Sequence, residues 1–552
     1  MTKKQHIILW SVLGGVAILL SVIISSADVI VTKIADRQLR NVLSKTDKVE
    51  VTYDKLHVLL MSGTVGFDNV TCRIPMQDSL TGVKAEQLIK IEDIDIRGIN
   101  WFRLRKKQLK ILSIRLKSPE TQFVLPPKEL KKKKDTTQPA DSSVHQFTDS
   151  PAHQFTVSID RVRVKNASVS LTRLGDKFAL HADSISLKAN DLSYDVASRQ
   201  FAYNDSVYSL SLGNFGMLTA DGLFELLIKG LDTKDAGKIN IEGLRAHNTC
   251  KPAALSKAKG KVAVTWVDAS IMKLTTSSVN VIRQVRNKSV NIDSIAITGK
   301  RVEIYRDTQF PPKTPYGMPQ EGIMKIPMSV EIGTIRVSLP QFDVALMRDG
   351  NHVGKLALDH LHLNAASFSN KQGNTLKAHL TGKLGEGGAD MNLTLRNDKA
   401  CTFTFNFLGK DVSTEQLNSF VHPISGASVS ANIHSVEIKT KGDKQFNKGT
   451  FCMLYDELTA HITKEDAPIE RLAKNAGVIN FFAPAIIQKQ NPRSHNHEPF
   501  TPEINIARDP QKNFASYLMS PFMDGVMHTV LPDYIYQSIM KSISQKKAQE
   551  KK

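Results

Sequence analysis

The stretch IDRVRVKNASVSLTR, residues 159–173, decides the fold of this 552-residue chain. It returns without a gap as IDSIAITGKRVEIYR, residues 292–306, at a shift of 133 (292 − 159). A third copy, ILSIRLKSPETQFVL, spans residues 111–125 and aligns with the first at a shift of 48 (159 − 111). Apolar and polar residues alternate with a period of two in these copies, which is typical of β-strands with one buried face. The copies therefore predict a repetitive, mainly β protein.

Each copy opens with an apolar residue that is followed by two residues of any kind and a second apolar residue. One further residue then separates the second apolar residue from a third. The same spacing recurs at residues 67–72, 91–96, 332–337, 358–363 and 433–438, and the copy at 332–337 needs a two-residue insertion before Val344 to match further. A spacing of three moves a side chain to the other face of a strand, and a β-bulge restores the original face. Repeated bulges predict a long, twisted, curled antiparallel-type sheet. Chance is the alternative, because apolar alternation is common in β proteins.

An apolar run without a charge, residues 7–24, precedes the β region and follows Lys3 and Lys4. A membrane-spanning helix needs about 20 apolar residues, and flanking lysines stay on the cytoplasmic side. The run therefore predicts an uncleaved single-pass anchor with the rest of the chain exported. Its anchor residues include Ile7, Trp10, Leu13, Ile18, Leu20 and Ile24. A signal peptide cleaved after residues 25–27 is the alternative.

The composition is basic, with 73 Lys and Arg against 54 Asp and Glu and a formal net charge of +19. Such a balance favours an anionic partner, and export makes that partner anionic lipid rather than nucleic acid. The alternative is that the charge serves solubility alone. Four cysteines stand far apart at Cys72, Cys250, Cys401 and Cys452. Their spacing indicates neither a metal site nor a disulfide framework, and their pairing stays open.

Changes of pattern divide the chain into six predicted segments. They are the anchor (1–31), a β segment that starts with a helix near 33–44 (32–125), a disordered basic loop (126–153), a central repetitive β segment (154–410), a C-terminal α+β segment (411–532) and a charged tail (533–552). Further helical stretches are predicted at 412–423, 471–485 and 514–530. Ser413 is the expected N-cap of the first, and Pro521 is expected to kink or split the last.

The sequence shows no catalytic constellation. No Gly-rich phosphate loop follows a strand, and no nucleophile elbow is present. The best metal candidate is residues 495–498, HNHE, which stand between two prolines among polar residues. A metal site needs three or four converging ligands, so a solvated loop is the favoured interpretation of this motif. We expect no catalytic residue, metal or cofactor, and a protein that is not an enzyme.

Several segments resemble the AsmA-like family, whose members are anchored in the inner membrane of Gram-negative bacteria. Besides the anchor and the helix after it, these segments are residues 65–70 (VGFDNV), 88–99 (LIKIEDIDIRGI), 108–119 (QLKILSIRLKSP), 449–458 (GTFCMLYDEL) and 506–514 (IARDPQKNF). The long loop at 126–153 and the compact length depart from the largest members. Whether this chain alone reaches the outer membrane therefore stays open.

This resemblance implies a β-groove similar to the chorein-type lipid-transfer bridges, with the bulk of the chain in the periplasm. It further implies transfer of phospholipids between the inner and outer membranes, with a possible protein partner at the C-terminal end. Acyl chains would lie against one apolar face of the sheet. The expected lining residues are Ile94, Ile96, Ile114, Leu116, Val162, Val164, Ile295, Ile297, Ile335, Val337, Leu361 and Leu363.

Two other functions remain possible at this point. The chain can be a non-transporting assembly or scaffold factor for outer-membrane biogenesis, whose β faces are buried against each other. An exported hydrolase is the third candidate, which the lack of a catalytic constellation disfavours. The first two differ in whether the apolar face is covered. Alternation in the sequence is the same for a trough and a sandwich, so it does not separate them.

Overall fold

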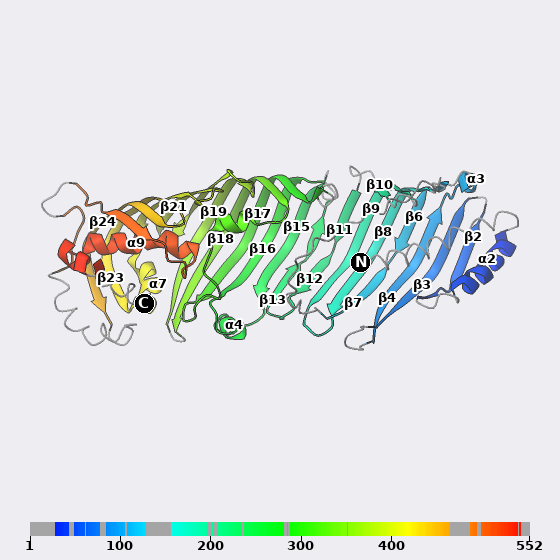
Figure 1. Ribbon diagram of the computed structural model, residues 1–552, viewed down its shortest axis with the longest axis horizontal. Helices are drawn as coiled ribbons and strands as arrows, with labels where there is room; N and C mark the ends of the chain where they lie inside the picture. Colours follow the sequence, from blue (N-terminus) through cyan, green and yellow to red (C-terminus); the bar gives the residue numbers. More distant parts are fainter. Residues whose placement is uncertain are drawn as a thin grey trace, which may run out of the picture. The chain divides into compact units, whose positions relative to one another are not determined.

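The computed structural model describes residues 28–43, 49–60, 62–77, 84–104, 108–127, 156–195, 200–202, 208–233, 237–280, 284, 287–349, 352–463, 486–493, 498–538 and 540–541. The described part is mainly β with a few helices, as predicted (Figure 1). It divides into two compact units, an N-terminal unit Met1–Gly237 and a C-terminal unit Lys238–Lys552. This division falls inside the predicted segment 154–410.

The N-terminal unit builds its sheet around two long strand pairs. Its elements are α2 (Asp28–Leu43), β1 (Glu50–Thr52), β2 (Lys55–Leu59), β3 (Thr64–Gln77), β4 (Lys84–Arg97), α3 (Trp101–Leu104), β5 (Gln108–Ile111), β6 (Ser113–Lys117), β7 (Glu120–Leu125), β8 (Thr156–Arg173), β9 (Ala179–Asp195), β10 (Gln200–Ala202), β11 (Tyr208–Leu212), β12 (Asn214–Leu218), β13 (Phe224–Ile228) and β14 (Gly230–Asp232). Strand β3 pairs antiparallel with β1, β2 and β4, and β8 pairs antiparallel with β9. Strands β5, β6 and β7 run parallel beside β8.

The C-terminal unit is a meander of long strands. Its elements are β15 (Lys238–Asn248), α4 (Pro252–Ala258), β16 (Thr265–Ser278), β17 (Ser289–Asp307), α6 (Pro319–Met324), β18 (Ser329–Asp349), β19 (His352–Ser369), β20 (Thr375–Leu384), β21 (Gly387–Arg396), β22 (Phe403–Val412), α7 (Thr414–Ser425), β23 (Ala427–Gly442), β24 (Phe446–Ile462), β25 (Glu503–Ala507) and α9 (Phe514–Val530). Each strand pairs antiparallel with the next, except that β17 and β18 are parallel.

The prediction of an antiparallel-type sheet is therefore wrong in part, because both units are mixed. Parallel neighbours need a crossover that carries the chain back along the strand, whereas antiparallel neighbours need only a turn. Residues 308–328, which include α6, form that crossover between β17 and β18. The parallel neighbours are also the repeated copies of the sequence pattern.

The register of the parallel pairs accounts for the repeats. Ile111 pairs with Ile159, Ile114 with Val162, and Thr121 with Val169, so the predicted shift of 48 is the register of β5, β6 and β7 against β8. In the C-terminal unit a shift of 40 holds from the pair Ile292–Ile332 to the pair Ile304–Val344. The two-residue insertion predicted before Val344 is therefore wrong, because the two strands stay in one register along their whole length.

The position of the bulges differs between the copies. In the copies at 358–363 and 433–438 a register shift falls within the three-residue spacing, between Asp359 and His362 and between Ile433 and Ser435, as predicted.

In the copy at 159–164 the shifts lie after the spacing. Ile159 and Val162 keep one register against β9, and the shifts occur between Val164 and Ala167 and between Ala167 and Val169. Asn166, between these residues, has a φ of 54°, and Ser118 has a φ of 46° at the matching place in the neighbouring copy (166 − 118 = 48). Asparagine enters this left-handed region more readily than most residues. For this copy alone, the bulge expected between Ile159 and Val162 is therefore wrong in position.

Helices cover the sheet at one end of each unit. In the N-terminal unit, Ala35 and Leu39 of α2 pack with Leu56 and Val58 of β2 in a buried cluster. Figure 1 shows α2 beside β2. In the C-terminal unit, Tyr517 and Leu518 of α9, together with Met318 before α6, pack on strands β20 to β25 in a larger cluster. Figure 1 shows α9, in red, lying across β23 and β24.

The predicted helices that fall on described residues are confirmed. Helix α2, Asp28–Leu43, covers the helix expected near 33–44 up to Leu43 and begins earlier, and α9 has the expected bounds 514–530. Pro521 does not split α9, which is continuous through it. The missing N–H of Pro521 leaves the Tyr517 carbonyl without its usual helical donor, and the buried Asn447 side chain donates to that carbonyl at 3.5 Å.

The predicted cap at Ser413 is also present, and it carries a first prediction. The Ser413 hydroxyl accepts a hydrogen bond from the Gln416 amide at 3.4 Å. We expect Ser413→Ala to lower the free energy of unfolding by about 1 kcal/mol, because one N–H at the start of α7 loses its acceptor. Urea denaturation measures the change. Ser413→Asp keeps an acceptor and should restore stability, and equal losses in both variants would contradict a capping role.

Other predictions fall on residues outside the described part. They are the anchor run 7–24, most of the basic loop 126–153, the helix at 471–485, three residues of the motif at 495–498 and the end of the charged tail. Among the described helices, none is both long enough and apolar enough to cross a bilayer.

Candidate functional site

Six of the predicted lining residues meet in one block of the N-terminal unit. Residues that pair across neighbouring strands place their side chains on the same face, so each register row forms a stripe across the sheet. Two such stripes cross this unit, and we call them the N-terminal apolar rows. The first is Val65, Ile96, Ile114, Val162 and Ala189; the second is Phe67, Ile94, Leu116, Val164, Leu187 and Leu210.

Burial falls along these rows with distance from α2. Val65 and Phe67 are buried, at 2% and 8% exposure, within the cluster that α2 covers. Ile94, Ile96 and Ile114 are half-buried and pack against the edge of that cluster. Further along, Leu116, Val162, Val164, Leu187, Ala189 and Leu210 are half-buried and belong to neither buried cluster. In the described part of this unit, neither α2 nor α3 packs extensively on β8 or β9.

The C-terminal unit repeats this arrangement over more strands, in two stripes that we call the C-terminal apolar rows. The first is Ile241, Leu274, Ile297, Val337, Leu363, Leu380, Met391, Phe407, Ile438 and Phe451; the second is Ile295, Ile335, Ala365, Ala378, Leu393 and Phe405. Five predicted lining residues stand in these rows. The sixth, Leu361, pairs with Leu339 beside them.

Burial in the C-terminal rows rises toward α9. Phe405, Ile438 and Phe451 are at most 1% exposed in the cluster that α9 covers. Ile295, Ile297, Ile335, Val337 and Leu363 are half-buried and lie outside that cluster. Leu361 differs from them, at 5% exposure. Its partner Leu339 is also buried and fills the space beside Gly299, where a Cβ atom would lie 2.0 Å from Leu339 Cδ2.

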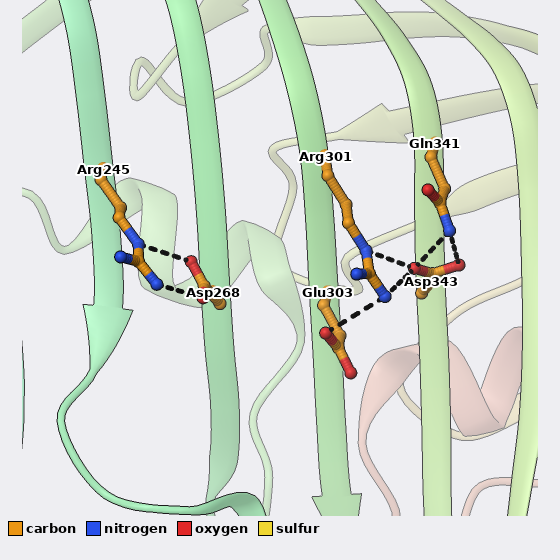
Figure 2. A network of polar contacts seen from close by, with 6 residues as sticks. All are labelled: Arg245, Asp268, Arg301, Glu303, Gln341 and Asp343. Carbon is orange, nitrogen blue, oxygen red and sulfur yellow. Dashed lines mark hydrogen bonds and ion pairs between the residues drawn. The ribbon is translucent and has the colours of Figure 1, made fainter.

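The opposite face of the same strands is polar and charged (Figure 2). Arg301 donates to Asp343 at 2.7 Å and contacts Glu303 at 3.3 Å, and Gln341 also donates to Asp343. One strand away, Arg245 makes two hydrogen bonds to Asp268, at 2.8 and 3.2 Å. Because side chains alternate along a strand, Arg301 and Glu303 point away from Val302 and Ile304. The register shift at Ile271, opposite Gly299 to Arg301, places one extra residue between Ile297 and Val302, which brings Val302 to the face of Ile297. The central part of this sheet therefore has one apolar face and one polar, charged face.

These ion pairs keep the polar face charged. The hydrogen bonds from Arg245 hold the pKa of Asp268 below its ordinary value, and the hydrogen bond to Asp343 raises the pKa of Arg301. Both arginine side chains are half exposed, so solvent screens the pairs and each contributes little to stability. Their effect is to hold this face in water, which leaves the apolar rows as the face that needs cover.

Helix α4 does not supply that cover. The indole N–H of Trp266 donates to the Cys250 carbonyl, just before α4, at 2.8 Å. Alternation along β16 places Trp266 on the same face as Asp268. Helix α4 therefore begins on the polar side of the sheet.

The described residues contain no group of three or more His, Cys, Asp or Glu placed to hold a metal ion. Of the motif at 495–498, only Glu498 lies in the described part. All four cysteines are free, and burial raises the pKa of the Cys72 thiol. The apolar rows have the means to bind apolar matter.

Comparison with known proteins gives no family assignment: no protein-family model and no curated protein matches the sequence. The function is therefore argued from the two sets of apolar rows and from the resemblance in the sequence.

Sequence reasoning missed several members of the rows. Leu187 and Leu274 lack the three-residue spacing, yet register places them beside Val164 and Ile297. The simple alternation around them in the sequence was a usable signal. A prediction of lining residues from the three-residue spacing alone therefore left out residues of the rows that only alternate.

Proposed function

We propose that the apolar rows bind the acyl chains of phospholipids, and that the protein transfers phospholipids between the inner and outer membranes as a step in envelope biogenesis. One observation carries the proposal. Lining side chains such as Val164 and Ile297 lie outside both buried clusters, while the opposite face of the central sheet is charged. An uncovered, continuous apolar surface usually marks a binding site.

The energetics of this proposal are favourable. Each buried methylene contributes about 0.8 kcal/mol, so an acyl chain that buries even half of its length on the rows gains several kcal/mol. Headgroups would stay in water beside the strand ends. Sliding along such a surface requires no catalytic residue and no cofactor, so the proposal includes no enzymatic activity.

The resemblance to AsmA-like proteins supplies the location in this proposal. The run at 7–24 would hold the chain in the inner membrane as a single pass, with Lys3 and Lys4 on the cytoplasmic side. The bulk of the chain would lie in the periplasm. A protein of the outer membrane or the periplasm would meet its C-terminal end.

A scaffold or assembly factor is the second candidate, and one observation favours it. Met519 and Met523 stand one helical turn apart on α9 and are 46% and 53% exposed. Flexible methionine side chains on a helix suit a protein partner. A scaffold needs this surface and does not need open apolar rows, so occupancy of the rows separates the two candidates.

Photo-crosslinking tests the proposal directly. We expect p-benzoylphenylalanine at Val164 or Ile297 to capture phospholipid in cells, because these side chains face the rows. Matched positions one residue away, Lys165 and Ala296, are exposed on the other face and should capture at least five-fold less. Mass spectrometry of the adducts is the measurement. Adducts to protein alone at Val164 and Ile297 would favour the scaffold.

A further inference from the structure

One edge of the N-terminal unit exposes large apolar side chains that no core uses. Phe102 of α3 is 86% exposed, more than any other large hydrophobic residue of the described part. Leu59, at the end of β2, is 51% exposed, and Leu112, between β5 and β6, is 44% exposed. All three stand where their strands turn rather than along the apolar rows.

Hydrogen bonds and one close contact hold these turns together. The Ile99 amide donates to the Gly63 carbonyl at 2.9 Å, which joins the turn after Leu59 to the end of β4. The Leu112 amide donates to the Arg97 carbonyl at 3.1 Å. Gly98, with a φ of 67°, approaches Leu112 so closely that a Cβ atom would lie 2.5 Å from the leucine Cβ. The exposed side chains therefore share one fixed edge.

The chain around this edge is strongly basic. Residues 96–119 contain eight Lys and Arg and no Asp or Glu. Of the described basic side chains, Arg97, Lys110, Arg115 and Lys117 pair with Asp95, Asp160 or Glu92, so much of this charge is balanced. Arg103 is exposed beside Phe102. A highly exposed aromatic residue beside an exposed arginine fits the interfacial zone of a bilayer with anionic lipid.

We propose that this edge, formed by Leu59, Phe102, Arg103 and Leu112, rests on the surface of a bilayer that contains anionic phospholipid. Phe102 would enter the headgroup region, and Arg103 would face lipid phosphates. The contact would fix the orientation of the N-terminal unit on its membrane. It is separate from lipid transfer, because none of these residues belongs to the apolar rows.

The test uses the full chain in proteoliposomes with p-benzoylphenylalanine at Phe102. We expect lipid adducts in vesicles of phosphatidylcholine with 30% phosphatidylglycerol. Their yield should exceed, at least five-fold, the yield from the same probe at Met272, which is 49% exposed on β16. Vesicles of phosphatidylcholine alone should lower the yield at Phe102 several-fold, because the basic residues then lose their counter-charge.

Charge reversal supplies the matched control. Arg103→Glu should lower the yield at Phe102 several-fold, and Lys165→Glu, the same change on the exposed face of β8, should leave it unchanged. Equal melting temperatures of the two variants show that folding is intact. Yields at Phe102 no higher than at Met272, equal yields in neutral and anionic vesicles, or adducts to a second protein chain would each overturn the proposal. None of these results depends on lipid capture at Val164 or Ile297.

Discussion

An aspartate at Ile297 should leave the C-terminal unit folded, whereas an aspartate at Ile438 should unfold it. The two isoleucines stand in the same apolar row, with five strands between them. Ile438 is 1% exposed beneath α9, while Ile297 is half-buried and outside the cluster. The same change therefore meets two environments.

The magnitudes follow from burial. At Ile438 the substitution removes a core side chain, at about 2 to 5 kcal/mol, and adds an unpaired buried charge, at about 3 to 5 kcal/mol. Their sum is comparable with the whole stability of a typical domain, about 5 to 15 kcal/mol. At Ile297 the carboxylate stays in contact with water, and we expect a loss of about 1 to 2 kcal/mol. Chemical denaturation of the full-length protein measures both.

The Ile297→Asp protein should stay folded but capture much less phospholipid. Folded Ile297→Asp protein should lose most of the phospholipid adducts at a probe on Val337, its partner on β18, because a charge in the row repels acyl chains. Ile295→Asp and Ile335→Asp, in the second row, should behave like Ile297→Asp. If all three unfold as Ile438→Asp does, the rows form a closed core and the scaffold becomes the better proposal.

The repeats in the sequence predicted more of the fold than expected from alternation alone. The copies at 111–125 and 159–173, which align without gaps, became neighbouring parallel strands, so Val162 stands beside Ile114 at the predicted shift. The copy at 292–306 lies in the other unit, beside the copy that starts at Ile332. Two neighbouring parallel strands in one register pack their side chains in similar surroundings. Both strands therefore keep the same spacing of apolar residues. The alternation did not indicate whether neighbouring strands run parallel or antiparallel. Their direction depends on crossovers such as residues 308–328, whose composition resembles that of any loop.

The position of the bulges shows a different limit. In the copy at 159–164, Val164 is half-buried and Ala167, three residues later, is buried, so the sequence did contain this phase change. It was masked because Ala167 is small and weakly apolar. The backbone signal, a positive φ at Asn166, has no counterpart in hydrophobic patterning.

The sequence pattern could not predict which part of the apolar face is covered by a helix. Ile297 and Ile438 stand in the same register row and have the same side chain. They differ only in whether α9, about 80 residues later in the chain than Ile438, folds back over them. Whether the candidate site is open is thus set by tertiary contacts between distant segments, which a local period does not record.

Gly525 of α9 provides the second large effect. Ala normally favours a helix interior over Gly by about 1 kcal/mol, so a glycine here needs a reason. A Cβ atom at Gly525 would lie 2.2 Å from Cγ and 2.5 Å from Cβ of Phe451, which is fully buried on β24. These atoms are close to the backbone of Phe451 and have little freedom to move aside. Because Gly525 has no side chain, α9 can pack closely against Phe451 on the sheet.

Gly525→Ala should therefore lower the free energy of unfolding by about 1 to 3 kcal/mol or more, because overpacking outweighs the gain in helix propensity. Gly322→Ala is the matched control, since nothing lies within 4 Å of a Cβ at this other helical glycine, and it should be neutral or stabilising. Thermal melting compares the two. Lifting α9 should also uncover the row beneath it, so a probe at Ile438 should begin to capture phospholipid in the Gly525→Ala protein. An unchanged melting temperature would show that Phe451 yields to the new methyl group, and that α9 does not depend on this contact to cover the apolar row.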